Sequence, residues 1–368
     1  MYDTELGLSV TKIAVMGFGA FILAFLLTPA LTHVLYTKKL WRKTVRTQAL
    51  GGGEMPFFKK FHSEGEVSTP RFGGMLIWLV PPFLAGIFFL LAQSGNQILE
   101  EFNFLSRGQT WLPIVTLLAA SSVGFADDAL QVIRPSTGGI WNKIWRKLGN
   151  HFAGGLSFKH RFGLISLIGL VGAWWFYSKL GIDVIHIPGI GEVPLGIFFI
   201  PFFLLVMLAT YSGGVIDGID GLAGGAFVYI FGAYGIISFI QGQIDLAAFC
   251  FAIVGALLAF LWFNIPPARF YMGEVGIMGL TATLTVVAFL TDAVSVLPII
   301  AFLLVIESAS VIIQVLSKKL RDGKKVFLAA PIHHHFEAKG WPSYKITMRF
   351  WVIGMVMAII GVAIQLLG

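Results

Sequence analysis

Residues 244–263 read IDLAAFCFAIVGALLAFLWF and contain one charged side chain, Asp245. An α-helix of about 20 apolar residues spans the hydrocarbon core of a bilayer, which is about 30 Å thick. This stretch has that length and that composition, so it predicts a membrane-spanning helix. Similar stretches recur along the chain, and together they decide the class of fold.

The composition of the whole chain agrees with this reading. The chain is 57% hydrophobic and 12% charged, with a mean hydropathy of +0.83, whereas about a quarter of the residues in a soluble domain are charged. We therefore predict an all-α, polytopic integral membrane protein with about ten spans, forming a single transmembrane domain over residues 1–368. The spans are expected near residues 11–36, 73–93, 110–126, 162–178, 193–211, 222–241, 244–263, 276–290, 293–316 and 350–367.

The basic residues fall on one side of these spans. Of the 26 Lys and Arg residues, all but Lys12, Arg107 and Lys179 lie in segments on one side, which the positive-inside rule makes cytoplasmic. An even number of spans then places both termini outside, and the acidic start of the chain predicts no cleaved signal peptide. The cytoplasmic loops are expected near residues 37–72, 127–161, 212–221, 264–275 and 317–349.

The net charge of +7 is therefore a one-sided field. Such a field suits anionic membrane lipids and polyanionic substrates. The role of basic residues in setting the membrane topology explains much of this charge on its own. No nucleic-acid partner is predicted. The single cysteine, Cys250, lies in an apolar span and supports neither a disulfide framework nor a cysteine metal site.

Two short segments carry patterns of their own. Residues 140–148 interleave apolar and basic side chains at helical spacing, which predicts a helix in the headgroup plane or a solvated cytoplasmic helix. Residues 184–193 alternate around a glycine-rich turn and predict a small hairpin on the outer side.

Carboxylates stand at the predicted cytoplasmic ends of three spans. Asp127 and Asp128 close the third span, Asp217 and Asp220 follow the fifth, and Glu274 follows the seventh. Because a charge within the bilayer is costly, acids kept at span ends need a reason. Alone, each group could be a cap, a turn or a loop; together on one face they predict a site.

These acids have the chemistry of a metal site. Adjacent aspartates repel one another unless a cation lies beside them, and Mg²⁺ is the usual cation where oxygen ligands meet phosphates. Asp217 and Asp220 are three residues apart, so one helical turn would aim both the same way. Pooled with Glu274, the acids could hold Mg²⁺ and leave one carboxylate as nucleophile or base.

A run of three histidines, His333, His334 and His335, precedes the last span. Neighbouring residues on a helix are about 100° apart, so three adjacent imidazoles cannot share one helix face. A loop that wraps a ligand can use all three, and we expect such a loop here. A chance polar tract or a purification remnant is the alternative, but remnants lie at termini and this triplet is internal.

Several motifs together resemble one enzyme family. They are residues 329–342 with Arg349-Phe350-Trp351, Trp262-Phe263-Asn264 with Pro267-Ala268, Glu307 with residues 310–315, and residues 217–223. Over nearly the whole chain they are similar to the phospho-N-acetylmuramoyl-pentapeptide transferase family, a branch of the polyprenyl-phosphate N-acetylhexosamine-1-phosphate transferases. The histidine triplet is specific to this branch.

The resemblance implies an Mg²⁺-dependent transferase of the bacterial cytoplasmic (inner) membrane. It would move phospho-N-acetylmuramoyl-pentapeptide from UDP-N-acetylmuramoyl-pentapeptide to undecaprenyl phosphate, giving lipid I and UMP in peptidoglycan synthesis. An amphiphilic lipid acceptor and a water-soluble nucleotide can meet at the cytoplasmic ends of spans. The oligomeric state is left open, a homodimer included.

Matching the motifs residue by residue implies roles. Asp127 and Asp128 take the paired catalytic acids, and Asp127 is the one that activates or attacks. Glu274 takes the metal-binding acid, with Asp128 as a second ligand. The catalytic set also includes His333, and His334 and His335 would contact the phosphate or sugar side. The uridine would be held by Gly218, Ile219, Asp220, Asn264 and Tyr271, and Asp217 and Arg161 complete the substrate-binding set.

This chain departs from the family pattern near the acids. Glu274 stands where the family has Asp, and its extra methylene moves the carboxylate outward, in a chemistry that is sensitive to small displacements. Arg71 takes the place of a Thr, and the usual Lys of that segment is missing. Other departures are Ala129 and Gln131 in place of Tyr and Lys, and Tyr211, Gly214 and Ile216 in place of Asn, Asn and Thr.

Two other functions stay open at this point. A sibling transferase would move a different UDP-sugar phosphate; the loss of the two family Asn residues favours it, and the histidine triplet argues against it. A catalytically impaired homologue would only bind nucleotide-sugar, lipid or partners. A transporter is disfavoured because the acids cluster at one membrane face instead of at mid-span.

Overall fold

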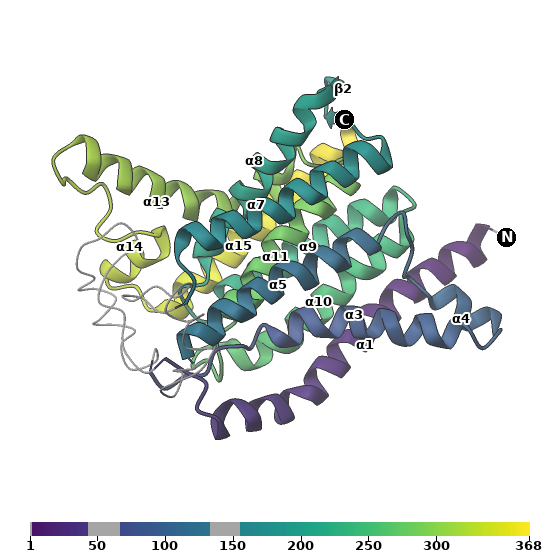
Figure 1. Ribbon diagram of the computed structural model, residues 1–368, viewed down its shortest axis with the longest axis horizontal. Helices are drawn as coiled ribbons and strands as arrows, with labels where there is room; N and C mark the ends of the chain where they lie inside the picture. The colour runs from purple at the N-terminus through teal and green to yellow at the C-terminus, as the bar shows by residue number, and fades with distance from the viewer. Residues whose placement is uncertain (1, 43–66, 133–154) are drawn as a thin grey trace.

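A computed structural model of the protein describes residues 2–42, 67–132 and 155–368. Long helices run side by side in one bundle, and shorter elements lie at its ends and edge (Figure 1). The bundle helices are α1 (Tyr2–Thr37), α3 (Met75–Ala92), α5 (Trp111–Val132), α7 (Phe158–Trp175), α8 (Phe199–Ser212), α9 (Leu222–Ile240), α10 (Ile244–Asn264), α11 (Glu274–Leu290) and α15 (Ser343–Leu367). The shorter elements are α4 (Gln97–Phe102), α12 (Leu297–Ile300), α13 (Phe302–Leu320), α14 (Ile332–Ala338) and the strands β1 (Val184–Ile187) and β2 (Gly191–Pro194). A π-helical turn lies at Phe176–Leu180, and 3₁₀ turns lie at Gly196–Phe198 and Gly213–Ile216.

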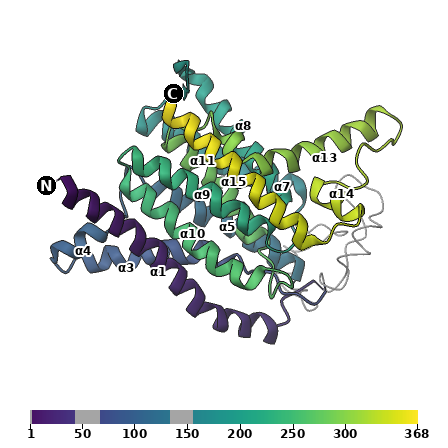
Figure 2. The same cartoon turned by 180° about the vertical axis from the view of Figure 1, so that it is seen from behind.

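The centre of the bundle is α11. Every residue from Val275 to Phe289 is buried, and the helix packs against α3, α5, α8 and α9. A helix that is apolar on all sides belongs in the interior. Beside this centre, α10 packs against both α1 and α9 (Figure 2). The first residue of α11 is thereby held at one end of a fully packed core.

The described part of the chain has eight helices long and apolar enough to cross a membrane, where about ten spans were predicted. The difference lies in the eighth and ninth predicted spans. α11 has 17 residues, and the stretch predicted as one span at 293–316 is divided at Ala301 into α12 and α13. α13 then leaves the bundle at an angle (Figure 1). The prediction of a helical, multi-pass membrane protein is confirmed. The hairpin β1–β2 adds a small sheet to the otherwise helical fold of the described residues.

Several helices continue into segments that were predicted to be loops. α5 runs through Asp127 and Asp128 to Val132, so the paired acids lie in its last turns. Likewise α7 includes Arg161, and α11 begins at Glu274. The predicted boundaries were wrong because hydropathy marks where the apolar stretch ends. A helix ends instead where its backbone hydrogen bonds end, and polar side chains can prolong it.

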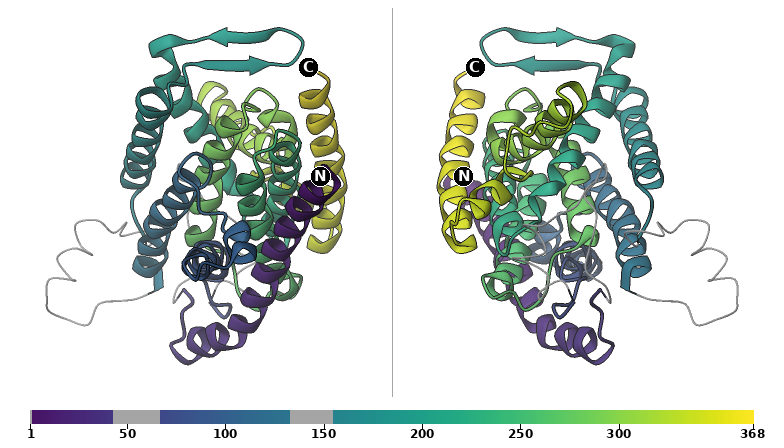
Figure 3. Two further views of the ribbon diagram at one scale, coloured as in Figure 1. Left: turned by 90° about the vertical axis from the view of Figure 1, so that its right-hand side faces the viewer. Right: turned by 90° about the vertical axis from the view of Figure 1, so that its left-hand side faces the viewer.

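The two ends of the bundle differ. At one end, the C-terminal Gly368 lies against Pro188 in the turn of the hairpin β1–β2 (Figure 3). Lys12 of α1 pairs there with Asp245 at the start of α10, with Nζ and Oδ1 2.7 Å apart. The predicted hairpin is confirmed as an antiparallel pair. The acids of α5 and α11 lie at the opposite end, and the helix predicted at 140–148 lies outside the described residues.

A glycine lets α5 approach α11. A Cβ on Gly124 would overlap the backbone carbonyl of Glu274, so the two helices can lie this close only with glycine at the contact. Gly124→Ala is therefore expected to lower the free energy of unfolding by about 1–3 kcal/mol, as overpacking does. Unfolding of the purified variant in detergent measures the loss. Gly232→Ala on α9 is the matched control, because nothing lies within 4 Å of a Cβ there; equal losses in both variants would contradict this account.

Candidate active site

Four carboxylates meet at the end of the bundle opposite the hairpin. Asp127 and Asp128 come from the last turns of α5, Glu274 from the first residue of α11, and Asp217 from the turn that follows Gly213–Ile216. Asp217 lies within electrostatic range of both Glu274 and Asp128. The structure thus brings together acids from separate spans, as the sequence predicted.

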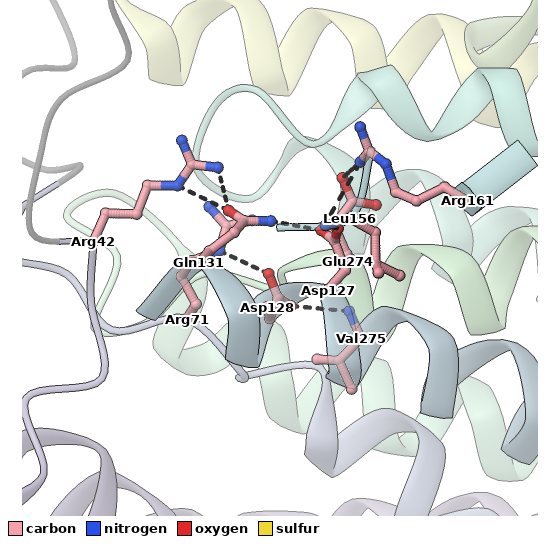
Figure 4. Close-up of polar contacts among 9 residues, drawn as sticks. All are labelled: Arg42, Arg71, Asp127, Asp128, Gln131, Leu156, Arg161, Glu274 and Val275. Atoms are coloured by element: carbon pink, nitrogen blue, oxygen red, sulfur yellow. Dashed lines mark hydrogen bonds and ion pairs between the residues drawn. The ribbon is translucent and has the colours of Figure 1, made fainter. Parts of the chain in front are cut away.

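Asp128 is held from two sides (Figure 4). Its Oδ1 accepts a hydrogen bond from Nε of Arg71 at 2.9 Å, and its Oδ2 accepts one from the backbone N–H of Val275 at 3.0 Å. The side chain of Asp128 is fully buried, and that of Arg71 is 11% exposed. Burial disfavours the charged guanidinium, but Asp128 beside it, together with Glu274 and Asp217, more than offsets this and raises the pKa of Arg71. The guanidinium therefore stays charged inside the protein.

Asp127 is oriented by a different set of partners. Its Oδ1 accepts a hydrogen bond from the backbone N–H of Leu156 at 2.6 Å, and its Oδ2 accepts one from Nε2 of Gln131 at 2.5 Å. Gln131 is fixed in turn by Arg42, whose Nε donates to its Oε1 at 2.9 Å. Gly155 has a φ of +76° and lies so close to Asp127 that a Cβ would come within 2.7 Å of Oδ1. The carboxylate therefore has a fixed orientation.

Glu274 forms an ion pair with Arg161, with Oε1 and Nη1 2.8 Å apart. The same nitrogen lies 3.9 Å from Oδ2 of Asp127, so one guanidinium links the acids of α5 and α11 (Figure 4). The Glu274 side chain is 25% exposed, which leaves it accessible to a ligand. Arg161, predicted from the sequence to bind substrate, thus lies within the acid cluster.

Arg71 and Arg42 belong to the site, although no role was predicted for them. The segment that carries Arg71 runs beside the one that leads into α11. The backbone N–H of Tyr271 donates to the carbonyl of Pro70 at 2.8 Å, and that of Gly73 donates to the carbonyl of Tyr271 at 2.9 Å. The sequence signal for Arg71 was its departure from a family Thr in a segment that lacks the usual Lys.

Asp217 and Asp220 have different partners, which corrects the prediction that one helical turn aims both the same way. The helical turn ends at Ile216, and a tight turn of the chain follows. Asp217 accepts a hydrogen bond from the backbone of Gly273, within the acid cluster. Oδ2 of Asp220 instead accepts one from the backbone N–H of Ala268 at 3.0 Å. The spacing of three residues orients side chains alike only in a continuing helix.

The pKa of Asp217 predicts a pH dependence of stability. Loss of hydration raises this pKa to about 7, with Arg71 opposing the shift and Glu274 and Asp128 adding to it. An aspartate in an unfolded chain titrates near pH 4, so between about pH 4 and pH 7 the folded state holds a proton that the unfolded state has lost. Stability from this group therefore falls as the pH rises through that window.

Unfolding titrations in EDTA at several pH values test this dependence. Asp217→Asn is expected to gain stability over the wild type progressively from about pH 4 to pH 7, and the gain is expected to level off above that. Because Asp217 is an exposed residue, water screens its charge, and the gain is expected to be well below the full effect of the pKa shift. Asp322→Asn, at an exposed turn, is the matched control; the same pH trend in both variants would contradict the assignment to Asp217.

Asn264 ties together the two loops of the predicted nucleotide pocket. Its Oδ1 accepts a hydrogen bond from the backbone N–H of Gly221 at 3.0 Å, and its Nδ2 donates to the carbonyl of Phe270 at 2.9 Å. Ile219, in the turn before Gly221, is buried. Burial raises the pKa of the Tyr271 phenol. Both ends of the Asn264 amide are used inside the protein, so this residue shapes the pocket from within.

The three histidines lie in the short helix α14 and not in the predicted loop. The prediction was wrong because the seven residues of α14, about two helical turns, fit between Pro331 and Lys339, and nothing in the histidines prevents a helix. The rings of His333 and His334 lie edge to face with their centroids 4.2 Å apart, yet the three imidazoles have different polar partners. Nδ1 of His333 lies 2.9 Å from Oε2 of Glu307, and Nδ1 of His334 lies 2.6 Å from Oε2 of Glu337. Nδ1 of His335 accepts a hydrogen bond from the backbone N–H of Leu328 at 3.1 Å.

The donor chemistry of the acids fits Mg²⁺. Among the residues that the structure describes, no three His, Cys, Asp or Glu side chains form a ready metal cluster. Mg²⁺ needs fewer protein ligands, because it is usually bound by one or two carboxylates together with waters and substrate phosphates. An ionised carboxylate has about four acceptor sites, so the contacts of Asp128 and Glu274 leave capacity for a cation. These two residues therefore suit the predicted ligand pair.

Comparisons with known proteins bear on the same residues. A family model for glycosyl transferase family 4 matches residues 110–292, the part of the chain that holds all four acids. The helical membrane bundle with its acid cluster thus falls in the class of membrane-embedded glycosyl transferases of this family.

Curated relatives narrow the class further. The phospho-N-acetylmuramoyl-pentapeptide-transferase of Lactiplantibacillus plantarum is 34% identical over 346 residues, which are 93% of this chain and 95% of the relative. Those of Levilactobacillus brevis and Listeria innocua are each 36% identical, over 76% and 77% of this chain and 83% of each relative. The chain belongs to the phospho-N-acetylmuramoyl-pentapeptide transferase family.

Proposed function

We propose that this chain transfers phospho-N-acetylmuramoyl-pentapeptide from UDP-N-acetylmuramoyl-pentapeptide to undecaprenyl phosphate, releasing UMP and giving lipid I in peptidoglycan synthesis. The convergence of the four carboxylates with Arg71 and Arg161 at one end of a membrane bundle carries the proposal. Phosphoryl transfer is catalysed mainly by positioning and by stabilisation of charge. Acids able to hold a cation, with guanidinium groups beside them, supply both.

The proposed reaction is a single displacement at phosphorus. An oxygen of the acceptor phosphate attacks the β-phosphorus of the UDP donor, the bond to the bridging oxygen breaks, and UMP leaves with that oxygen. Asp127 is assigned the activation of the acceptor, whose phosphate proton its carboxylate removes. The hydrogen bonds from Leu156 and Gln131 hold that carboxylate in place. Arg161 is assigned the role of stabilising the negative charge of the pyrophosphate.

Glu274 and Asp128 are assigned to hold Mg²⁺. The bound ion would neutralise the charge of the pyrophosphate. The nucleotide is assigned to the turn after Gly213–Ile216 and to the loop between α10 and α11, where an aromatic side chain can stack on the base. The residues proposed there are Gly218, Ile219, Asp220, Asn264 and Tyr271.

The chain is proposed to lie in the bacterial inner membrane with the acid cluster at the cytoplasmic face and both termini outside. The one-sided distribution of Lys and Arg supports this orientation. α11 and the α12–α13 pair would then complete ten spans, and membrane lipids would surround the exposed apolar faces. A homodimer is compatible with this placement.

Release of UMP by the purified protein tests the proposed function. The protein is incubated with undecaprenyl phosphate, Mg²⁺ and either UDP-N-acetylmuramoyl-pentapeptide or UDP-N-acetylglucosamine. Release from the pentapeptide donor, lost when EDTA removes the metal, is the expected result. Release from the other donor alone would instead identify a sibling transferase. Binding of the pentapeptide donor without release would identify a homologue that only binds, and either result overturns the proposal.

A further inference from the structure

A buried acid–imidazole pair lies beneath the turn that carries Asp217. Glu307 of α13 and His333 of α14 are both fully buried, and Oε2 of the acid lies 2.9 Å from Nδ1 of the ring. The other two polar atoms of the pair, Oε1 of Glu307 and Nε2 of His333, have no hydrogen-bond partner within the described residues. Because buried polar atoms nearly always have partners, two such atoms in one pair call for an explanation.

The free nitrogen of this pair is aimed at Gly218. A Cβ on Gly218 would overlap Nε2 of His333, so the residue after Asp217 must be glycine for the imidazole to lie there. α13 is held against the preceding helix α8 near this turn, where the hydroxyls of Ser212 and Ser308 are 3.1 Å apart. Three segments far apart in the sequence therefore meet around this one ring.

The chemistry of the pair selects one tautomer of the imidazole. An ionised carboxylate only accepts hydrogen bonds, so Glu307 requires the proton of His333 to be on Nδ1. Nε2 then carries a lone pair that faces the turn at Gly218. A carboxylate behind a histidine commonly fixes the orientation and the tautomer of the ring in this way.

We propose that Glu307 is a positioning residue of the transferase reaction: it locks His333 so that Nε2 accepts a hydrogen bond at the Asp217 and Gly218 turn during turnover. This inference rests on the proposed function. Glu307 acts through the imidazole and does not itself contact substrate. The role also separates the histidines, because His334 pairs with Glu337 of its own helix and His333 faces the acid-bearing turn.

Kinetics of UMP release test the role of the carboxylate. Glu307→Gln keeps the size of the side chain and removes its charge, so kcat is expected to fall roughly 10- to 100-fold. The KM for the UDP donor and the melting temperature are expected to stay near those of the wild type. Glu307→Asp restores a carboxylate and is expected to recover part of the rate. A Glu307→Gln variant with wild-type kcat would overturn the proposal.

Ser310→Ala is the matched control for these variants. The Ser310 hydroxyl donates to the backbone carbonyl of Glu307 at 2.7 Å, so its removal alters the same turn of α13 without changing the carboxylate. Its kcat is expected to equal that of the wild type. A loss as large as that of Glu307→Gln would show that packing of α13, and not the carboxylate, sets the rate, and would overturn the proposal.

The tautomer of His333 can be read without any donor. In protein labelled with ¹⁵N-histidine, and with His333→Gln for assignment, Nδ1 is expected to be protonated and Nε2 to be free. A proton on Nε2 would overturn the proposal. If the Glu307→Gln variant does not fold, this measurement on the wild type is the deciding test. If the wild type shows the expected tautomer but releases no UMP, the transferase function fails while the arrangement of Glu307 and His333 stands.

Discussion

The Arg71→Met variant is expected to lose about 3–5 kcal/mol of unfolding free energy, because it leaves the carboxylate of Asp128 buried without its cation. Asp128 is fully buried and Arg71 nearly so, so water cannot replace the lost partner. Methionine keeps an unbranched apolar stem of similar width, which limits the effect of lost packing. Unfolding by SDS in mixed micelles, followed by circular dichroism, measures the change.

Two further variants decide whether the loss comes from the unpaired charge. Adding Asp128→Leu to Arg71→Met removes both charges and is expected to recover most of the stability, since replacing a whole buried pair by apolar side chains is often close to neutral. Arg107→Met, at an exposed position, is the matched control and is expected to change stability by less than about 0.5 kcal/mol. A double variant that is no more stable than the single one would contradict the ion-pair account.

The second large effect is expected for catalysis: Asp127→Asn is predicted to lower kcat for UMP release by about 10²- to 10⁴-fold. That range is typical for the loss of a general base. The amide oxygen of asparagine can still accept the hydrogen bond from Leu156, but it cannot take the proton of the acceptor phosphate. The measurement is UMP release with saturating UDP-N-acetylmuramoyl-pentapeptide and undecaprenyl phosphate.

A loss of rate is informative only if the variant is folded and binds its ligand. Asp127→Asn places an amide nitrogen where the carboxylate accepts a hydrogen bond from Nε2 of Gln131, so its melting temperature is expected to fall slightly while the variant stays folded and keeps the wild-type affinity for UMP. Asp322→Asn makes the same chemical change at an exposed turn of the chain and is expected to leave kcat unchanged. Wild-type turnover in Asp127→Asn would remove Asp127 from the role of base.

Hydropathy predicts the long helices well, because backbone polar groups within a bilayer must be satisfied inside each segment. The stretch at 244–263 is the clearest case, and it forms α10 almost to the residue. The same reasoning divided the chain wrongly at Asp127 and Asp128, where the helix continues. At that point the neighbouring elements satisfy the acids, so the end of the apolar stretch no longer coincides with the end of the helix.

The acids of the site and Arg161 were predicted from the sequence, whereas Arg71 and Arg42 were not. Paired aspartates at a span end are conspicuous because their burial is costly, and so they attracted a functional interpretation. Arg71 lies in a loop rich in other basic residues, so its charge alone did not identify it as a site residue. What distinguishes it is the burial beside Asp128, and that depends on the backbone pairing between its loop and the segment before α11.

For the histidine triplet, the sequence identified the residues and misjudged the local structure. The 100° spacing correctly excluded one shared face, but a loop was inferred where α14 forms. The partner of His333 is Glu307, 26 residues earlier in the chain, and no local pattern links the two. Their contact exists because α13 and α14 fold back on each other beside the turn at Gly218.

The sequence by itself determined that this is a helical, multi-pass membrane protein with acids gathered at the ends of its spans. Those properties follow from local composition measured against the thickness and polarity of a bilayer. Only the tertiary structure decided which cation neutralises which acid and which histidine faces them. The physical reason is that ion pairs such as Arg71 with Asp128, 57 positions apart, depend on how helices and loops pack in space, and local spacing carries no information about that.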